Sequence, residues 1–192
     1  MDPSTPNTII GVQLNCQSLN TKLSDTKLLI YKIKPTFACF CETWINNCNR
    51  TPNFVDYHTI WRHRYGPRGG GLGILVRRGV QHSELPLKYY KDGGLEAQAV
   101  KIFDRHNNPI TILNVYKPPN KNLTLLELRH YIKQLGPKYI ITGDFNAHSP
   151  ILDDRINNPD QAGKVIEDLI LKDDVCLINP PNFYTRIAFT KK

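Results

Sequence analysis

Short apolar runs rich in β-branched residues recur along this chain, and the strongest of them stop at polar residues. Runs of four to eight such residues bounded by turn-forming residues are typical of buried strands. The strongest runs are residues 8–14, 36–41, 110–115 and 139–142, and weaker strand patterns cover residues 57–62, 72–77 and 95–103. The chain is therefore predicted to contain several buried strands.

Three other segments have the spacing of amphipathic helices. Residues 24–33 can be capped by Ser24 or Asp25, residues 123–135 precede a Gly-Pro pair, and Asp160 can cap a helix that follows it. Two short final strands are predicted at residues 175–178 and 183–189. The mixed order predicts an α/β or α+β fold with one core, and 192 residues fit a single domain.

Polar side chains stand directly after the buried strands. They are Asn15, Glu42, Tyr116, and Asp144 with Asn146. Strand ends of α/β sheets converge where ligands bind, and the strands behind them hold such side chains rigidly. Carboxylate and amide oxygens suit Mg²⁺ better than Zn²⁺ or copper. Each residue alone is also a common start of a loop, but the ordered set predicts a hard-metal site.

Five segments of the sequence resemble conserved motifs of one superfamily. They are residues 14–18 (LNCQS), 41–44 (CETW), 69–76 (GGGLGILV), 114–119 (NVYKPP) and 143–148 (GDFNAH). In this order they resemble the exonuclease III/apurinic endonuclease/DNase I superfamily, most closely the endonuclease domains of non-LTR retrotransposons. The resemblance spans residues 9 to about 185 and implies a four-layer α/β sandwich, with residues 1–192 forming one endonuclease/exonuclease/phosphatase domain.

The resemblance also implies a role for each strand-end residue. Glu42 would hold a catalytic Mg²⁺, or Mn²⁺ in its place, with Asn15 beside it. Asp144 would orient or activate the attacking water, while Asn146 and Tyr116 would bind the scissile phosphate. A metal and fixed donors are the groups that stabilise the charge developing on the phosphate oxygens.

One motif of the family is missing. The family continues with an aspartate-bearing strand and a Ser-Asp-His ending, and neither occurs in this sequence. We therefore expect nicking by this chain alone to be weak or absent, since general acid–base help contributes ~10²–10⁴-fold. The domain is expected to be incomplete at its C-terminus, leaving an exposed sheet edge that invites self-association or a partner chain.

Basic residues predict a nucleic-acid partner. The chain has 25 Lys and Arg against 17 Asp and Glu, hence a formal charge of +8. Phosphate contacts are expected from the segment around the glycine run and from two other positions, and double-stranded DNA is the expected partner. The candidates are Arg62, Arg64, Tyr65, Arg68, Lys117 and Thr185, with Arg77 and Arg78 as weaker ones. A glycine hairpin with solvated charges is the alternative for residues 62–71.

The remaining features bear on location. Five cysteines, an odd number, favour free thiols in a reducing compartment, and Cys39 and Cys41 are expected to pack in the core rather than bind zinc. No apolar run is long enough to cross a membrane, so we expect no membrane partner and an intracellular protein. Nuclear localisation is implied by the resemblance.

The leading hypothesis is a retrotransposon-type DNA endonuclease that leaves a 3′-hydroxyl to prime reverse transcription. One alternative is a domesticated, catalytically dead remnant that binds DNA or protein. Another is a phosphodiesterase that acts on a different phosphate ester, since the superfamily includes such enzymes.

Overall fold

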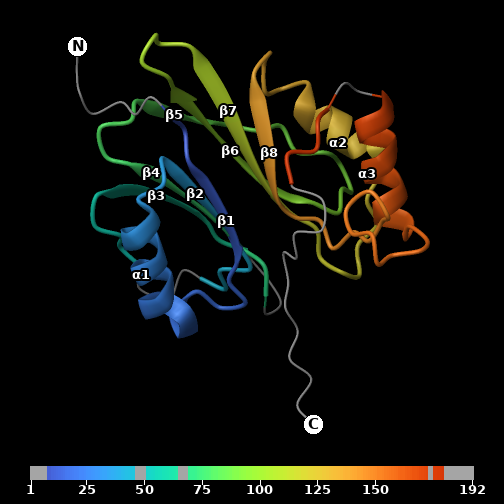
Figure 1. The fold of residues 1–192 in the computed structure, drawn as a ribbon, viewed down its shortest axis with the longest axis horizontal. Helices are drawn as coiled ribbons and strands as arrows, with labels where there is room; N and C mark the ends of the chain where they lie inside the picture. Colours follow the sequence, from blue (N-terminus) through green and yellow to red (C-terminus); the bar gives the residue numbers. More distant parts are fainter. Residues whose placement is uncertain (1–7, 46–50, 65–68, 173–174, 180–192) are drawn as a thin grey trace.

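The computed structural model describes residues 8–45, 51–64, 69–172 and 175–179. Two four-stranded mixed sheets pack face to face, and helices cover the outer face of each (Figure 1). Helix α1 lies on one side of the pair, and α2 and α3 lie on the other. The predicted four-layer α/β sandwich is therefore confirmed.

The first sheet has the strand order β1-β2-β4-β3. Strands β1 and β2 are parallel, whereas β4 runs antiparallel to both β2 and β3. Its elements are β1 (Gly11–Asn15), a 3₁₀ turn (Asn20–Lys22), α1 (Leu23–Ile33), β2 (Phe37–Cys41), β3 (Tyr57–Arg62) and β4 (Leu72–Arg77).

The second sheet has the order β5-β6-β7-β8. Strands β5, β6 and β7 are antiparallel neighbours, and β7 and β8 are parallel. Its elements are β5 (His82–Leu85), β6 (Glu96–Phe103), β7 (Pro109–Tyr116), α2 (Leu125–Ile132), β8 (Tyr139–Asp144) and α3 (Gln161–Lys172).

Strand β2 shows why this sequence forms layers. All five of its residues are buried, because successive side chains point to opposite faces and both faces are covered. Ala38 and Phe40 pack with Ile30 of α1, whereas Phe37 and Cys39 pack between the sheets. The opposite sheet repeats this pattern, with one face against the first sheet and the other against α2 and α3.

Several predicted boundaries differ from the structure. Strands β1 and β8 extend to Asn15 and Asp144, so these polar residues end their strands rather than follow them. Strand β5 was not predicted, because its sequence, HSEL, has no apolar alternation. The strand predicted at residues 175–178 is wrong, since that segment has no regular structure. The strand predicted at residues 183–189 lies outside the described residues.

The helix ends also differ. Helix α1 begins at Leu23 without a side-chain cap, so the predicted caps from Ser24 and Asp25 are wrong. Helix α2 is shorter than predicted and is capped by Thr124, whose side chain accepts a hydrogen bond from the Glu127 backbone. In the part of the chain that is described, no helix has both the length and the apolar character needed to cross a bilayer.

Candidate active site

The predicted strand-end residues meet because of the strand pairing. In the first sheet, Asn15 at the end of β1 lies beside Cys41, the residue before Glu42. In the second sheet, Tyr116 lies beside Asp144 at the ends of β7 and β8. Strands β1 and β8 lie side by side, one from each sheet. All five predicted residues, Asn15, Glu42, Tyr116, Asp144 and Asn146, line one cavity of about 540 Å³.

Asn15 joins the two carboxylates of the cavity. Its Nδ2 donates to Glu42 Oε1 at 2.7 Å and to Asp144 Oδ2 at 2.5 Å. Its Oδ1 accepts a hydrogen bond from the Gln17 backbone at 3.2 Å. In this orientation Asn15 holds the carboxylates together with its nitrogen, and the amide would have to turn over to offer an oxygen to a metal.

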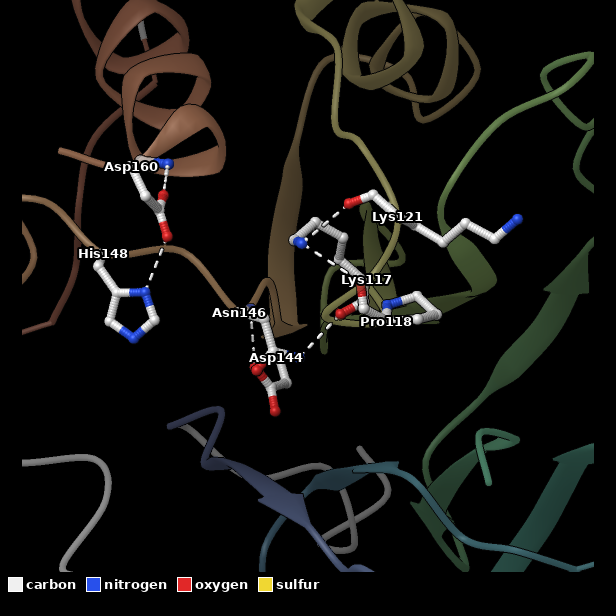
Figure 2. Close-up of polar contacts among 8 residues, drawn as sticks. Lys117, Pro118, Lys121, Asp144, Asn146, His148 and Asp160 are labelled. Carbon is white, nitrogen blue, oxygen red and sulfur yellow. Dashed lines mark hydrogen bonds and ion pairs between the residues drawn. The ribbon is translucent and has the colours of Figure 1, made fainter. Parts of the chain in front are cut away.

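Asp144 and Asn146 form a short loop at the end of β8. Asp144 Oδ1 accepts from the Asn146 backbone at 2.9 Å, and Asn146 Nδ2 donates to the Lys117 carbonyl at 2.8 Å (Figure 2). Asn146 has a φ of 42°, a left-handed conformation that Asn tolerates better than most residues. The loop after β8 is thus hydrogen-bonded to the residue that follows β7.

Tyr116 and Glu42 interact across the two sheets. Burial, the Glu42 charge and a hydrogen bond with Glu42 together raise the pKa of the Tyr116 hydroxyl. The Tyr116 side chain is buried, yet it lines the cavity. The hydroxyl therefore keeps its proton at neutral pH and can donate a hydrogen bond.

Gly143 fixes the position of Asp144. It has a φ of 143°, and a Cβ built there would lie 1.9 Å from the Val115 carbonyl oxygen. No other residue type fits this close approach between β7 and β8 without moving backbone. The glycine therefore sets how closely Asp144 approaches the end of β7.

Among the described residues, the predicted phosphate-binding cations are not brought together. Arg64 lines the cavity, but Arg62 donates to the Ala97 carbonyl and lies over the Tyr89 ring. Lys117 does not have the surface position predicted for it. It is buried, and its ammonium donates to the carbonyls of Pro118 and Lys121.

The remaining predicted contacts are Arg77, Arg78, Tyr65, Arg68 and Thr185. Arg77 is at the opposite end of β4 from the cavity, and it donates to the Lys34 carbonyl. Tyr65, Arg68 and Thr185 lie outside the described residues.

Sequence reasoning missed several residues of the cavity wall. They are Gln17, Trp44, Gly69, Gly70, Pro118, Pro119 and Asn120. Six of them lie inside the motif segments 14–18, 41–44, 69–76 and 114–119, and Asn120 directly follows the last of these. The motifs were therefore a usable signal for the cavity wall, although the sequence analysis assigned these residues no role in the site.

All six histidines of the sequence lie within the described residues, and none of them lines the cavity. His148 Nδ1 lies 2.8 Å from Asp160 Oδ2, next to the start of α3 (Figure 2). Hydrogen bonds from Gly163 and His148 lower the pKa of Asp160, although burial raises it. His148 therefore pairs with the residue that caps the start of α3.

Cys39 and Cys41 lie in the core, as expected. Cys39 and Cys41 are fully buried, and burial raises the pKa of the Cys41 thiol to about 12. The described residues include no group of three or more His, Cys, Asp and Glu side chains that is close enough to hold a metal ion. Any metal in the cavity would therefore rely on the two carboxylates and on non-acidic ligands.

Known proteins resemble this chain in sequence. Residues 110–191 match the family described as endonuclease-reverse transcriptase. Half of the chain is 28% identical, over 96 residues, to the RNA-directed DNA polymerase of the mobile element jockey from Drosophila funebris. The match covers only 10% of that relative's length.

Solved structures share the fold. The endonuclease domain of TRAS1, a telomere-specific non-LTR retrotransposon, superposes with a TM-score of 0.63 at 19% identity, covering 83% of this chain and 70% of that one. The chain resembles the endonucleases of non-LTR retrotransposons. A 3′-5′ exonuclease from Neisseria meningitidis also matches, with a TM-score of 0.58 at 16% identity over 84% of this chain and 70% of that one. The resemblance inferred from the motifs is confirmed.

Proposed function

We propose that residues 1–192 act as one endonuclease domain, which nicks double-stranded DNA by hydrolysing a phosphodiester. The observation that carries this proposal is the convergence of two carboxylates, two amides and a tyrosine hydroxyl, from both sheets, on one cavity. The neutral Asn15 amide donates to both carboxylates, and two neighbouring carboxylates favour a cation near them.

The donor set fits a hard divalent cation. Glu42 and Asp144 offer carboxylate oxygens, and Mg²⁺ is commonly bound through one or two carboxylates with water completing its shell. We propose that Glu42 holds Mg²⁺, or Mn²⁺, near Asn15. The ion would supply positive charge to the phosphate oxygens as they become more negative.

The reaction would use the remaining residues as follows. A water oxygen forms a bond to phosphorus while Asp144 takes its proton, and the bond from phosphorus to O3′ breaks. The O3′ atom takes up a proton from solvent water and leaves as a 3′-hydroxyl, which is able to prime reverse transcription, and Asp144 later returns its proton to solvent. The Tyr116 hydroxyl and the Asn146 amide would donate to phosphate oxygens, and both groups already line the cavity.

Nicking of supercoiled plasmid tests this proposal. The wild-type chain should nick with Mg²⁺ and stop when EDTA is added, and Asp144→Asn should lower the rate by about 10³-fold, as losing a catalytic group commonly does. Asp25→Asn, an exposed carboxylate in α1, is the matched control. Equal rates for Asp144→Asn and Asp25→Asn would refute the role of Asp144.

A second candidate is binding without efficient cleavage. The observation that favours it is that none of the six histidines lines the cavity. We propose that the chain alone nicks slowly and that a chimera carrying a relative's Ser-Asp-His segment nicks faster. If the bare chain nicks as fast as the chimera in an Asp144-dependent way, the histidine is not required.

A related proposal concerns the sheet edges. Strands β1 and β8 each pair with one neighbour only among the described residues, so each offers a free edge on that part of the chain. An open edge can take up another strand, so we propose self-association or a partner chain there. Sedimentation velocity over a range of concentrations would test self-association.

We also propose that the protein is nuclear, because its proposed substrate is chromosomal DNA. The location of a fluorescently tagged chain in cells would test this.

A further inference from the structure

Glu96 is a third carboxylate near the cavity, and no motif singled it out. It is the first residue of β6 and pairs with Tyr116 in the sheet. Its side chain is only 17% exposed. One oxygen, Oε2, accepts a hydrogen bond from the Gly71 backbone at 2.8 Å. The carboxylate therefore reaches from the second sheet to the loop before β4 in the first.

The other oxygen of Glu96 faces Arg64. The distance from Arg64 Nε to Glu96 Oε1 is 3.5 Å, which makes an ion pair but is too long for a good hydrogen bond. Oε1 is buried and has no hydrogen-bond partner among the described residues. Arg64 is partly exposed and lines the cavity. The guanidinium is thus charge-paired at one end and open to the cavity.

Gly70 makes this arrangement possible. It has a φ of 70°, and a Cβ built there would lie 2.4 Å from Glu96 Oε1 and 2.5 Å from Arg64 Cδ. Any larger residue would push the carboxylate and the arginine apart. Gly69, Gly70 and Arg64 line the cavity, and Glu96 contacts Arg64 and Gly71 without lining it.

The same segment is attached to the loop that carries Glu42. The Gly71 carbonyl accepts from the Thr43 backbone at 3.1 Å, and the Gly70 carbonyl accepts from the Trp44 backbone at 3.0 Å. Glu96 therefore holds the amide side of the segment while residues 43 and 44 hold its carbonyl side. A change at Glu96 would be transmitted to both the wall and the site.

We infer that Glu96 is a positioning residue that aims Arg64 and the glycine segment 69–71 at a phosphate of the bound strand; this inference rests on the proposed DNA endonuclease function. Without DNA, the carboxylate neutralises Arg64 and keeps it extended along the cavity wall. A phosphate of the DNA would compete for the exposed part of the guanidinium. Arg64 would then fix the register of the strand relative to Asp144.

Partners offset part of the cost of burying the Glu96 charge. Burial raises the pKa of Glu96, and the Gly71 hydrogen bond and the charges of Arg64 and Arg62 oppose that rise. A largely buried carboxylate depends on such partners to offset its desolvation. Glutamine at this position keeps the acceptor for Gly71 and removes the charge that restrains Arg64.

A double-mutant cycle tests the inference. The proteins are wild type, Glu96→Gln, Arg64→Gln and the double variant, with Glu84→Gln, an exposed carboxylate on neighbouring β5, as the control. DNA affinity is measured by fluorescence anisotropy on a duplex at several salt concentrations, and nicking is measured with Mg²⁺. Thermal unfolding shows whether each variant is folded.

The inference predicts opposite effects on binding and cleavage. Glu96→Gln should bind DNA about 2- to 5-fold more tightly at low salt, because Arg64 is no longer neutralised, yet nick about 10-fold more slowly once bound. Arg64→Gln should weaken binding and reduce the salt slope by ~0.9, the loss of one phosphate contact. In the Arg64→Gln background, Glu96→Gln should have no further effect on binding.

Other results would overturn it. A Glu96→Gln protein that behaves like Glu84→Gln, or additive effects of the two substitutions on binding, would show that Glu96 does not act through Arg64. If Glu96→Gln fails to fold, an unchanged salt slope in Arg64→Gln would by itself overturn the inference. Failure of the wild type to bind DNA would instead refute the proposed function. DNA binding without any Asp144-dependent nicking would refute the cleavage step, but the double-mutant cycle on DNA affinity would still test the role of Glu96.

Discussion

The strand-end side chains and the cations were both selected from the sequence as site residues, yet the fold places them differently. Asn15, Glu42, Tyr116, Asp144 and Asn146 all reach one cavity. Of the cations, Arg64 reaches it, whereas Lys117 and Arg62 bond to backbone carbonyls elsewhere. The backbone of the strand sets the position of a short side chain at its end. A long cationic side chain can instead reach a backbone carbonyl oxygen and bond to it.

The largest expected effect comes from the backbone that positions Asp144. Gly143→Ala should cost more than about 3 kcal/mol of unfolding free energy or prevent folding, because its Cβ would overlap the Val115 carbonyl. Urea unfolding measures this cost. Gly136→Ala is the control: Gly136 also has a positive φ, 85°, but open space around its Cβ, so the substitution should cost only about 1 kcal/mol. Equal costs would mean that the close approach between β7 and β8 is not what fixes the strand end.

The next effect tests what holds the two sheets together beneath the cavity. Asn114 is fully buried in β7, and its Nδ2 donates to the carbonyls of Phe40 at 2.9 Å and Gly73 at 3.2 Å in the other sheet. Asn114→Ala leaves both carbonyls without this donor and should cost about 2–4 kcal/mol in urea unfolding. Exposed Asn122→Ala should change stability by less than about 0.5 kcal/mol. A cost below 1 kcal/mol for Asn114→Ala would show that water or a shift of the sheets replaces these bonds.

The contrast also explains how far the sequence could predict this molecule. The period and length of the apolar runs predicted most strands, and their polar ends predicted the five cavity residues, because alternation and strand direction are local properties. Strand β5 was not predicted, because it forms by pairing with β6 and its own sequence has no apolar alternation. Arg64 was predicted from the sequence, but Glu96 was not, because the contact between them joins two sheets and no local spacing records which strands become neighbours.

Lys117 gives a smaller and more pointed test. Lys117→Met keeps the length of the side chain and removes the ammonium that donates to Pro118 and Lys121, so it should cost about 1–2 kcal/mol of stability. It should leave the salt slope of DNA binding unchanged, unlike Arg64→Gln. Anisotropy titrations at several salt concentrations make this comparison. If Lys117→Met reduces the salt slope as much as Arg64→Gln does, Lys117 contacts a phosphate of the DNA after all.

The smallest effect concerns a charge outside the cavity. Asp160 caps α3 through Gly163 at 2.6 Å and pairs with His148, and its pKa is lowered in the fold. A lowered pKa gives stability that is present above the unfolded value of about 3.9 and is lost as pH falls through the folded value. Asp160→Asn keeps a good capping residue and removes the charge. The free energy of unfolding of the wild type should therefore exceed that of Asp160→Asn by less than about 1 kcal/mol at pH 6, because the pair is exposed. This difference should shrink as pH falls below about 4. Thermal unfolding of both proteins from pH 6 to pH 3 measures it, and a difference that stays constant with pH would mean that capping alone, and not charge, holds the start of α3.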